Sequence, residues 1–253
     1  MKPIRLISRI DIKGLNAVKG IQLEGIRVVG NPCEMAERYY QQGADEVFVL
    51  DVVASLYQRD FDCQLLQQIS ERVFIPITAG GWIRSIEQIR EILRSGADKV
   101  ALNTAAVANP RFLSEAVEAF GAQCIVLSME AKKKAPAHWE AYTESGRQPT
   151  GLDAVKWAQR GIDLGVGELL ITSIDAEGAR GGFDLDLMQA ITAVSPVPVI
   201  AHGGAASPTS IKEVIIQSDV DAVSAASIYH YDLFSVNEVK NFLHEAGVNV
   251  RLL

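Results

Sequence analysis

Short runs of apolar residues alternate along this chain with longer segments that have helical period. Eight of the runs are apolar on both faces, which is typical of strands buried in a parallel sheet. The expected strands cover residues 4–10, 46–52, 74–79, 99–102, 124–129, 169–173, 197–201 and 222–225. The expected helices cover residues 31–42, 62–72, 85–95, 109–120, 152–164, 184–194, 208–217 and 235–246. The pattern therefore predicts eight strand–helix units.

Eight strand–helix units are the number that closes a sheet into a (β/α)8 barrel. The rival architecture is an open doubly wound sheet, which usually carries a glycine-rich phosphate-binding turn after its first strand. Here the first expected strand runs into Asp11-Ile12-Lys13-Gly14, which lacks that fingerprint. We therefore expect an α/β protein with a TIM-barrel fold, formed by residues 1–253 as a single domain.

An internal repeat divides the predicted barrel into two halves. Gly80-Gly81 recurs as Gly203-Gly204, and Asn103-Thr104 corresponds to Ala226-Ser227, in both cases 123 residues later. Offsets of 119 and 124 residues relate two further pairs, Asp11 with Glu130 and Asp51 with Asp175. Nearly constant offsets of this kind predict two (βα)4 half-barrels, which cover about residues 1–122 and 123–253.

The composition is that of an ordinary globular protein, with 48% hydrophobic and 22% charged residues. No apolar stretch approaches the roughly 18 residues that cross a membrane, and the N-terminus has no signal-peptide pattern. Cys33, Cys63 and Cys124 form an odd set without metal-ligand spacing, as expected of reduced cytosolic thiols. The net charge of -7 argues against a nucleic-acid-binding face. We expect a cytoplasmic protein with no membrane or nucleic-acid partner and no metal or redox cofactor.

One carboxylate ends the first strand of each predicted half. Asp11 and Glu130 are related by the repeat, so they are expected on opposite sides of the barrel mouth, where active sites of this fold lie. Facing carboxylates can divide the roles of acid and base when their surroundings push their pKa values apart. The alternative is that each carboxylate caps a loop or pairs with Lys13 or Lys132.

The repeated Gly-Gly pairs stand after the third and seventh expected strands. Small residues let backbone N–H groups approach an anion, and the hydroxyls of Thr104 and Ser227 can donate as well. Loops after the seventh and eighth strands are a frequent phosphate site in barrels. Two such sites predict a ligand with a phosphate at each end, although a Gly-Gly pair can also simply turn the chain.

Three other features concern the two ends of the barrel. Charges of alternating sign stand at the beginnings of four strands and could form a salt-bridged ring across the barrel floor, or be ordinary strand-start charges. Residues 13–30 form a long connection with several glycines, which is interpreted as a mobile lid. His202 precedes a Gly-Gly pair and either contacts the ligand or is a structural histidine. The four strand-start charges are Arg5, Glu46, Lys99 and Glu168.

Taken together, these motifs show that the sequence resembles the cyclase subunit of imidazole glycerol phosphate synthase over essentially its whole length. The half-barrel duplication is also a property of that family and of its isomerase relative in the same pathway. The resemblance implies a lyase of histidine biosynthesis that forms a heterodimer with a glutaminase. It is carried by the segments Asp11-Ile12-Lys13, Val18-Lys19-Gly20, Gly96-Ala97-Asp98-Lys99-Val100, Asn103-Thr104-Ala105-Ala106-Val107 and Leu170-Ile171-Thr172-Ser173-Ile174-Asp175.

The resemblance implies that the glutaminase docks on the N-terminal face of the barrel and that its ammonia passes through the barrel. At the mouth, ammonia would convert a phosphoribulosyl-formimino aminoimidazole carboxamide ribotide into imidazole glycerol phosphate and aminoimidazole carboxamide ribotide. Asp11 and Glu130 would be catalytic, and the four strand-start charges would form an ammonia gate. The residues that it places at the phosphorylated substrate are Lys19, Asp51, Gly81, Asn103, Thr104, Glu177, Gly178, Gly204, Ala226 and Ser227.

The sequence departs from the family pattern only at the substrate end. Glu130 and Glu177 replace aspartates, Trp82 replaces the third glycine of a phosphate loop, and His202 replaces a serine. One alternative is therefore a paralogue that channels ammonia with a glutaminase for amidation of a nucleotide sugar in surface-polysaccharide synthesis. A second alternative is a non-catalytic barrel that binds and activates the glutaminase.

Overall fold

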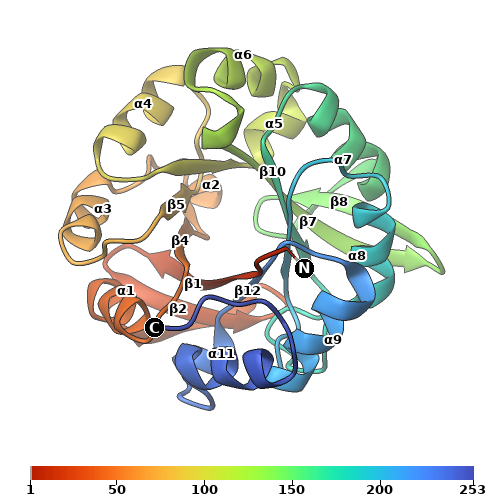
Figure 1. Cartoon of the computed structure of the whole chain (residues 1–253). Helices are drawn as coiled ribbons and strands as arrows, with labels where there is room; N and C mark the ends of the chain where they lie inside the picture. Colours follow the sequence, from red (N-terminus) through yellow and green to blue (C-terminus); the bar gives the residue numbers. More distant parts are fainter. Residues whose placement is uncertain (1) are drawn as a thin grey trace.

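The computed structural model describes residues 2–253, and these residues form a closed (β/α)8 TIM barrel. Figure 1 shows the strands at the centre and the helices in a ring around them. Eight parallel strands build the wall, and β12 pairs with β1 while β10 pairs with β7, so no barrel strand is left with a free edge. In order around the wall the strands are β1 (Arg5–Lys13), β4 (Glu46–Asp51), β5 (Ile77–Gly80), β6 (Lys99–Leu102), β7 (Ile125–Ala135), β10 (Glu168–Ser173), β11 (Val199–His202) and β12 (Ala222–Ala225).

Eight longer helices cover the outside of the wall, one after each barrel strand. They are α1 (Pro32–Gln41), α3 (Cys63–Ser70), α4 (Ile86–Arg94), α6 (Arg111–Phe120), α7 (Ala154–Asp163), α8 (Leu185–Thr192), α9 (Pro208–Ser218) and α11 (Val236–Glu245). Short helices are added as α2 (Ala54–Tyr57), α5 (Thr104–Ala108), η1 (Ala122–Cys124) and α10 (Ser227–His230). Every strand and helix expected from the hydrophobic pattern is present, with shifted ends. The expected strands at 74–79 and 197–201 begin later, directly after Pro76 and Pro198.

Two β-hairpins stand on the C-terminal side of the barrel, and both correct the sequence-based expectation. The stretch 13–30, expected to be a long βα loop and a mobile lid, is a hairpin of β2 (Asn16–Ile21) and β3 (Glu24–Gly30) that extends β1, and its mobility stays a prediction. The unexpected hairpin of β8 (His138–Thr143) and β9 (Gln148–Asp153) extends β7 in the same way. Both strands that open a predicted half-barrel therefore continue past the wall into a hairpin. The division into two half-barrels stays a prediction.

The hydrophobic core has two layers because barrel strands are buried on both faces. Residues that point outward pack under the helices, for example Leu6, Val47 and Leu127. Residues that point inward fill the lower lumen as a separate cluster of Ile7, Phe48, Ala101, Val126, Leu170, Ile200 and Ala222. Among residues 2–253 no helix is both long and apolar enough to cross a membrane.

Candidate functional site

The four strand-start charges form a closed ring at the N-terminal end of the barrel. Lys99 Nζ lies 3.0 Å from Glu46 Oε2 and 2.8 Å from Glu168 Oε2. Arg5 Nη1 lies 3.0 Å from the same Glu46 oxygen, and its Nη2 contacts Glu168. Each of the two glutamates thus forms ion pairs with both basic side chains, and both glutamates are buried. The four residues are not independent surface charges, because they cooperate to close the barrel floor.

A small cavity lies inside the lumen next to this ring. It has room for about one water molecule. The surface of the cavity is apolar, although Glu46, Thr78 and Ser224 are among the residues that line it. The apolar lining residues are Ile7, Phe48, Val126, Leu170 and Ile200.

Arg9 occupies the next inward-facing position on β1, and its side chain is only 1% exposed. Its Nε donates to Asp11 Oδ1 at 2.7 Å, and its Nη1 donates to Thr172 Oγ1 on β10 at 3.4 Å. Its guanidinium carbon lies 5.5 Å from the centre of the Phe48 ring on β4. Sequence reasoning did not single out this residue. The signal was present, because a charged residue between Ile7 and Asp11 has the alternation that faces the lumen.

Asp11 belongs to a buried charge network rather than to a free catalytic pair. Its second oxygen lies 3.5 Å from Nζ of Lys19 on β2, and Lys19 also contacts Glu177. Burial alone would raise the pKa of Asp11, but the charges of Arg9 and Lys19 outweigh burial and hold that pKa well below its usual range. The predicted alternative pairing with Lys13 is wrong, because the side chain of Asp11 is bound by Arg9 and Lys19.

His202 joins the same network from the end of β11. Its Nδ1 is 2.9 Å from the backbone oxygen of Ser224, and its Nε2 lies 3.3 Å from Glu177 Oε2. Burial, with the positive charges of Arg9 and Lys19, lowers the pKa of His202 well below its usual value. The ring is therefore neutral, with the proton on Nδ1 if it donates to the Ser224 oxygen.

Glu130 stands on the other side of the network in a different environment. One of its oxygens accepts hydrogen bonds from Asn103 Nδ2 at 3.0 Å and from the backbone N–H of Gly146 at 2.9 Å. Burial raises the pKa of Glu130 to about 7, and the negative charge of Asp11 adds to this rise. The two repeat-related carboxylates thus differ in protonation: Asp11 stays ionised, whereas Glu130 exchanges its proton near neutral pH.

The two expected phosphate loops have the backbone that glycine permits. Gly81 and Gly204 have φ values of 130° and 107°, and a Cβ on Gly204 would lie 2.0 Å from a backbone oxygen. Thr104 begins α5 and Ser227 begins α10, directly after β6 and β12. These short helices give both hydroxyls equivalent positions at the mouth.

Several expected substrate residues are already engaged within the protein. Asp51 accepts from Arg59 Nη2 at 2.6 Å and from the backbone N–H of Val53 at 3.1 Å. Gly178 packs against the β2–β3 hairpin, since a Cβ there would meet the backbone of Gly20. The hairpin is further tied down by a 2.7 Å backbone bond from Gln22 to Glu177. The structure therefore holds this hairpin over the mouth.

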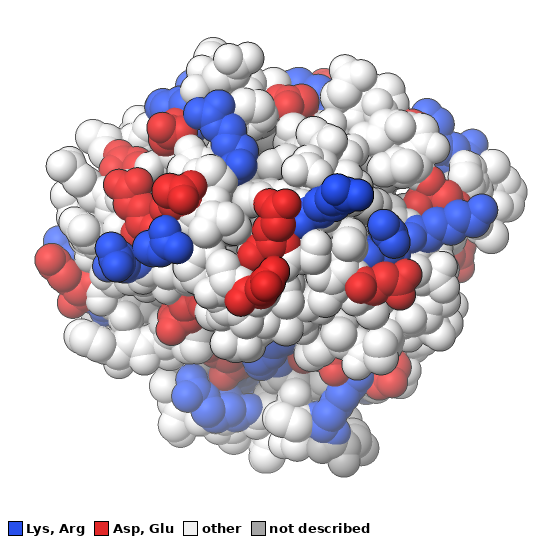
Figure 2. Space-filling model, turned by 90° about the horizontal axis from the view of Figure 1, so that it is seen from above, with Lys and Arg blue, Asp and Glu red and all other residues white. Residues whose placement is uncertain are grey.

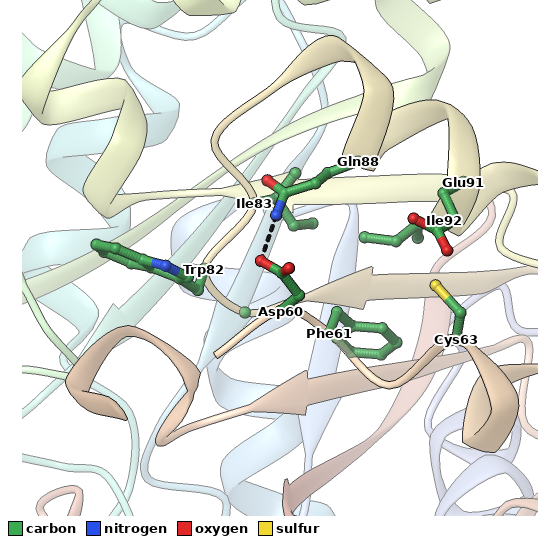
Figure 3. A pocket seen from close by; sticks show the side chains of 9 residues that line it. Asp60, Phe61, Cys63, Trp82, Ile83, Gln88, Glu91 and Ile92 are labelled. Atoms are coloured by element: carbon green, nitrogen blue, oxygen red, sulfur yellow. Dashed lines mark hydrogen bonds between the residues drawn. The ribbon is translucent and has the colours of Figure 1, made fainter. Parts of the chain in front are cut away.

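Trp82 takes a left-handed backbone conformation, with φ at 52°, in the loop after β5. Its ring stacks with Arg84, whose guanidinium carbon is 5.3 Å from the ring centre. Figure 3 shows the indole pointing away from Asp60 and Gln88, which share a 2.6 Å hydrogen bond in a pocket that Trp82 also lines. Trp82 and Thr104 both line a neighbouring groove of about 470 Å³. The side chain thus stands beside the expected phosphate loop.

Charges on the surface are mixed rather than segregated. Figure 2 shows Lys and Arg side chains interspersed with Asp and Glu on the face in view. The strongest groupings of charge described above are internal, at the floor ring and at the mouth network.

One comparison with known proteins bears on this site. The model of a protein family described as "Histidine biosynthesis protein" matches residues 5–235. The match spans the floor ring, the lumen, both hairpins and all of the mouth residues discussed above.

Proposed function

Because the chain belongs to the histidine biosynthesis protein family, we propose that it is the cyclase subunit of an imidazole glycerol phosphate synthase. It would use ammonia from a partner glutaminase to close the imidazole ring of a phosphoribulosyl-formimino substrate at the barrel mouth. The single observation that carries this proposal is the pair of buried carboxylates, Asp11 and Glu130, with opposite pKa shifts.

The carboxylate pair suits a reaction made of several proton transfers. Asp11 remains an anion, so it can stabilise positive charge that develops on the substrate nitrogen. Glu130 has a pKa of about 7, so at neutral pH it can both give and take a proton. A barrel that only activated a partner would have no need for this division of roles.

The floor ring supports ammonia as the second substrate. It joins Arg5, Glu46, Lys99 and Glu168 into one closed set directly beneath an apolar lumen cavity. An apolar passage suits neutral ammonia and disfavours water and ions. The isomerase branch of the family has no use for such an entrance, so the ring favours the cyclase branch.

The direct test is turnover of the phosphoribulosyl-formimino substrate by the purified chain with ammonium and no partner. We expect formation of imidazole glycerol phosphate, detected by mass spectrometry. Glu130→Gln should reduce the rate by about 100-fold or more, because it removes the proton-exchanging group. Exposed Glu118→Gln on α6 is the matched control and should leave the rate unchanged. No turnover at any ammonium concentration would exclude the cyclase proposal.

A second candidate is favoured by the closed charge network at the mouth. Arg9 and Lys19 are already paired with Asp11 and Glu177, so this network offers a bisphosphate no net positive charge. A chain of this kind could supply ammonia to a separate enzyme that amidates a nucleotide sugar. Failure of the cyclase assay, combined with glutamine-dependent amidation when that enzyme is added, would support it. Stimulation of the glutaminase alone would indicate a non-catalytic activator.

A further inference from the structure

Arg9 lies across the lumen between the two ends of the barrel. Its hydrogen-bond partner Thr172 is on β10, which is separated from β1 by β11 and β12. Its aromatic neighbour Phe48 is on β4, which adjoins β1 on the other side. A side chain that reaches both strands must cross the central space rather than follow the wall.

The position of Arg9 along the barrel axis is equally defined. Phe48 lines the small cavity next to the floor ring and also lies against the guanidinium. Asp11, the next inward residue of β1, belongs to the mouth. The guanidinium therefore lies between the cavity on the ring side and the carboxylates on the mouth side.

We propose that Arg9 is the internal barrier of the ammonia path, so that the lumen opens only when its guanidinium leaves Asp11. The proposal deepens the function proposed above, because it names the residue that controls transfer between the floor ring and the mouth. The barrier is steric for neutral ammonia, and the positive charge of Arg9 also repels ammonium.

The contacts of Arg9 fit a barrier that can open. One charge-assisted bond to Asp11 holds the side chain, and the bond to Thr172 is long. Its Nη2 is buried and makes no hydrogen bond within residues 2–253. Loss of a single bond of this kind makes an open state at least about 10-fold rarer than the closed one, and separation of the two buried charges makes it rarer still. The guanidinium is thus held, but not locked by a full set of partners.

A cysteine placed below the barrier tests the proposal without any partner or substrate. Ser224→Cys changes one atom of a side chain that lines the cavity and has no hydrogen-bond partner there. Methyl methanethiosulfonate, a small neutral thiol reagent, is then added to the full chain. Peptide mass spectrometry follows the modification of each thiol with time.

We expect the new thiol to react at least about tenfold faster when Arg9→Ala is added, because the side chain that keeps the lumen closed for most of the time is then gone. Arg9→Met is the matched control, since it removes the charge but keeps a long side chain, and it should keep the thiol protected. Buried Cys33 is the internal reference for general unfolding and should not change. The labelling rate of the new thiol is compared in chains with Arg, Ala or Met at position 9. Equal rates in all three chains, or equal rates in the Ala and Met variants, would overturn the steric barrier.

A second measurement links the barrier to ammonia. With a glutaminase bound, the ratio of glutamine-driven to ammonium-driven product should rise for Arg9→Ala, because added ammonium reaches the mouth from solution. The ratio cancels any direct effect of Arg9 on Asp11. Faster labelling of the Arg9→Ala variant, combined with no product from the chain that keeps Arg9 with either nitrogen source, would leave the barrier standing and refute the cyclase. Slow labelling with normal turnover would refute the barrier and leave the cyclase standing.

Discussion

Replacing Glu130 by glutamine should change how the stability of the protein depends on pH. The pKa of Glu130 rises from an ordinary value of 4.5 to about 7 in the folded chain. Below pH 4.5 the carboxyl is protonated in the folded and the unfolded chain, so its contribution to stability is fully present. As the pH rises to 7 and beyond, the unfolded chain ionises freely while the folded chain must ionise a buried group. The contribution is therefore lost between pH 4.5 and 7.

The size of this loss follows from the pKa difference. Each pKa unit corresponds to about 1.36 kcal/mol, so the rise to about 7 gives a loss of ~3 kcal/mol. Glutamine stays neutral at all these pH values, and its amide oxygen can accept the hydrogen bonds from Asn103 and Gly146. We therefore expect the stability of Glu130→Gln, relative to wild type, to increase by ~3 kcal/mol between pH 4.5 and 8.

Urea denaturation of both proteins at several pH values measures this difference directly. The exposed Glu118→Gln variant corrects for the general effect of removing a carboxylate. Carbon NMR of the Glu130 carboxyl gives the same pKa independently. A difference curve that stays flat between pH 4.5 and 8, or an NMR pKa near 4.5, would refute the reasoning from burial and the charge of Asp11.

Three further predictions concern the frame that carries the site. Asp45→Ala should lower the free energy of unfolding by ~3 kcal/mol or more, since Lys240 is 1% exposed and donates to Asp45 at 2.7 Å. Chemical denaturation measures this loss, and a loss under about 1 kcal/mol would contradict the prediction. Gly204→Ala should cost much more than Gly151→Ala, because both have positive φ but only the first Cβ meets other atoms; equal melting temperatures would contradict this. Ser235→Ala should cost ~1 kcal/mol by removing a capping box from α11, which thermal unfolding can measure, and an unchanged melting temperature would argue against the cap.

The wall of the barrel was predictable because its strands are apolar on both faces. That pattern is strong enough to fix the number and order of the barrel strands. It is weaker at strand ends, where Pro76 and Pro198 cannot donate to a neighbouring strand and so delay β5 and β11. The β8–β9 hairpin was missed for another reason. Its residues are mostly polar or mixed, since only part of it packs on the barrel, and no alternation marks it clearly.

The site was predictable to the extent that it follows from position in the barrel. The floor-ring residues stand at strand starts, and Asp11 and Glu130 stand toward strand ends. The internal repeat and the barrel fold are therefore enough to predict which end of the barrel each set occupies. What the pattern could not give is which charges meet. The contact between Lys19 and Glu177 joins residues that are far apart in the chain, through a hairpin folded over the mouth. The alternation of Arg9 with Ile7 and Asp11 places it in the lumen, but the sequence does not show that its side chain reaches Thr172 on β10.

Two of the departures at the mouth, His202 and Glu177, belong to one connected network. His202 lies beside Glu177, and Glu177 contacts Lys19, which in turn reaches Asp11. Arg9 completes the set from below, and its charge also affects Glu130. The cations Arg9 and Lys19 and the acids Asp11 and Glu177 balance each other's charge within one buried network, where an unpaired charge would be costly. Removing the charge of one of these residues alone therefore leaves an uncompensated group. The chemistry of this mouth depends on the network as a unit, so it has to be tested with coordinated rather than single substitutions.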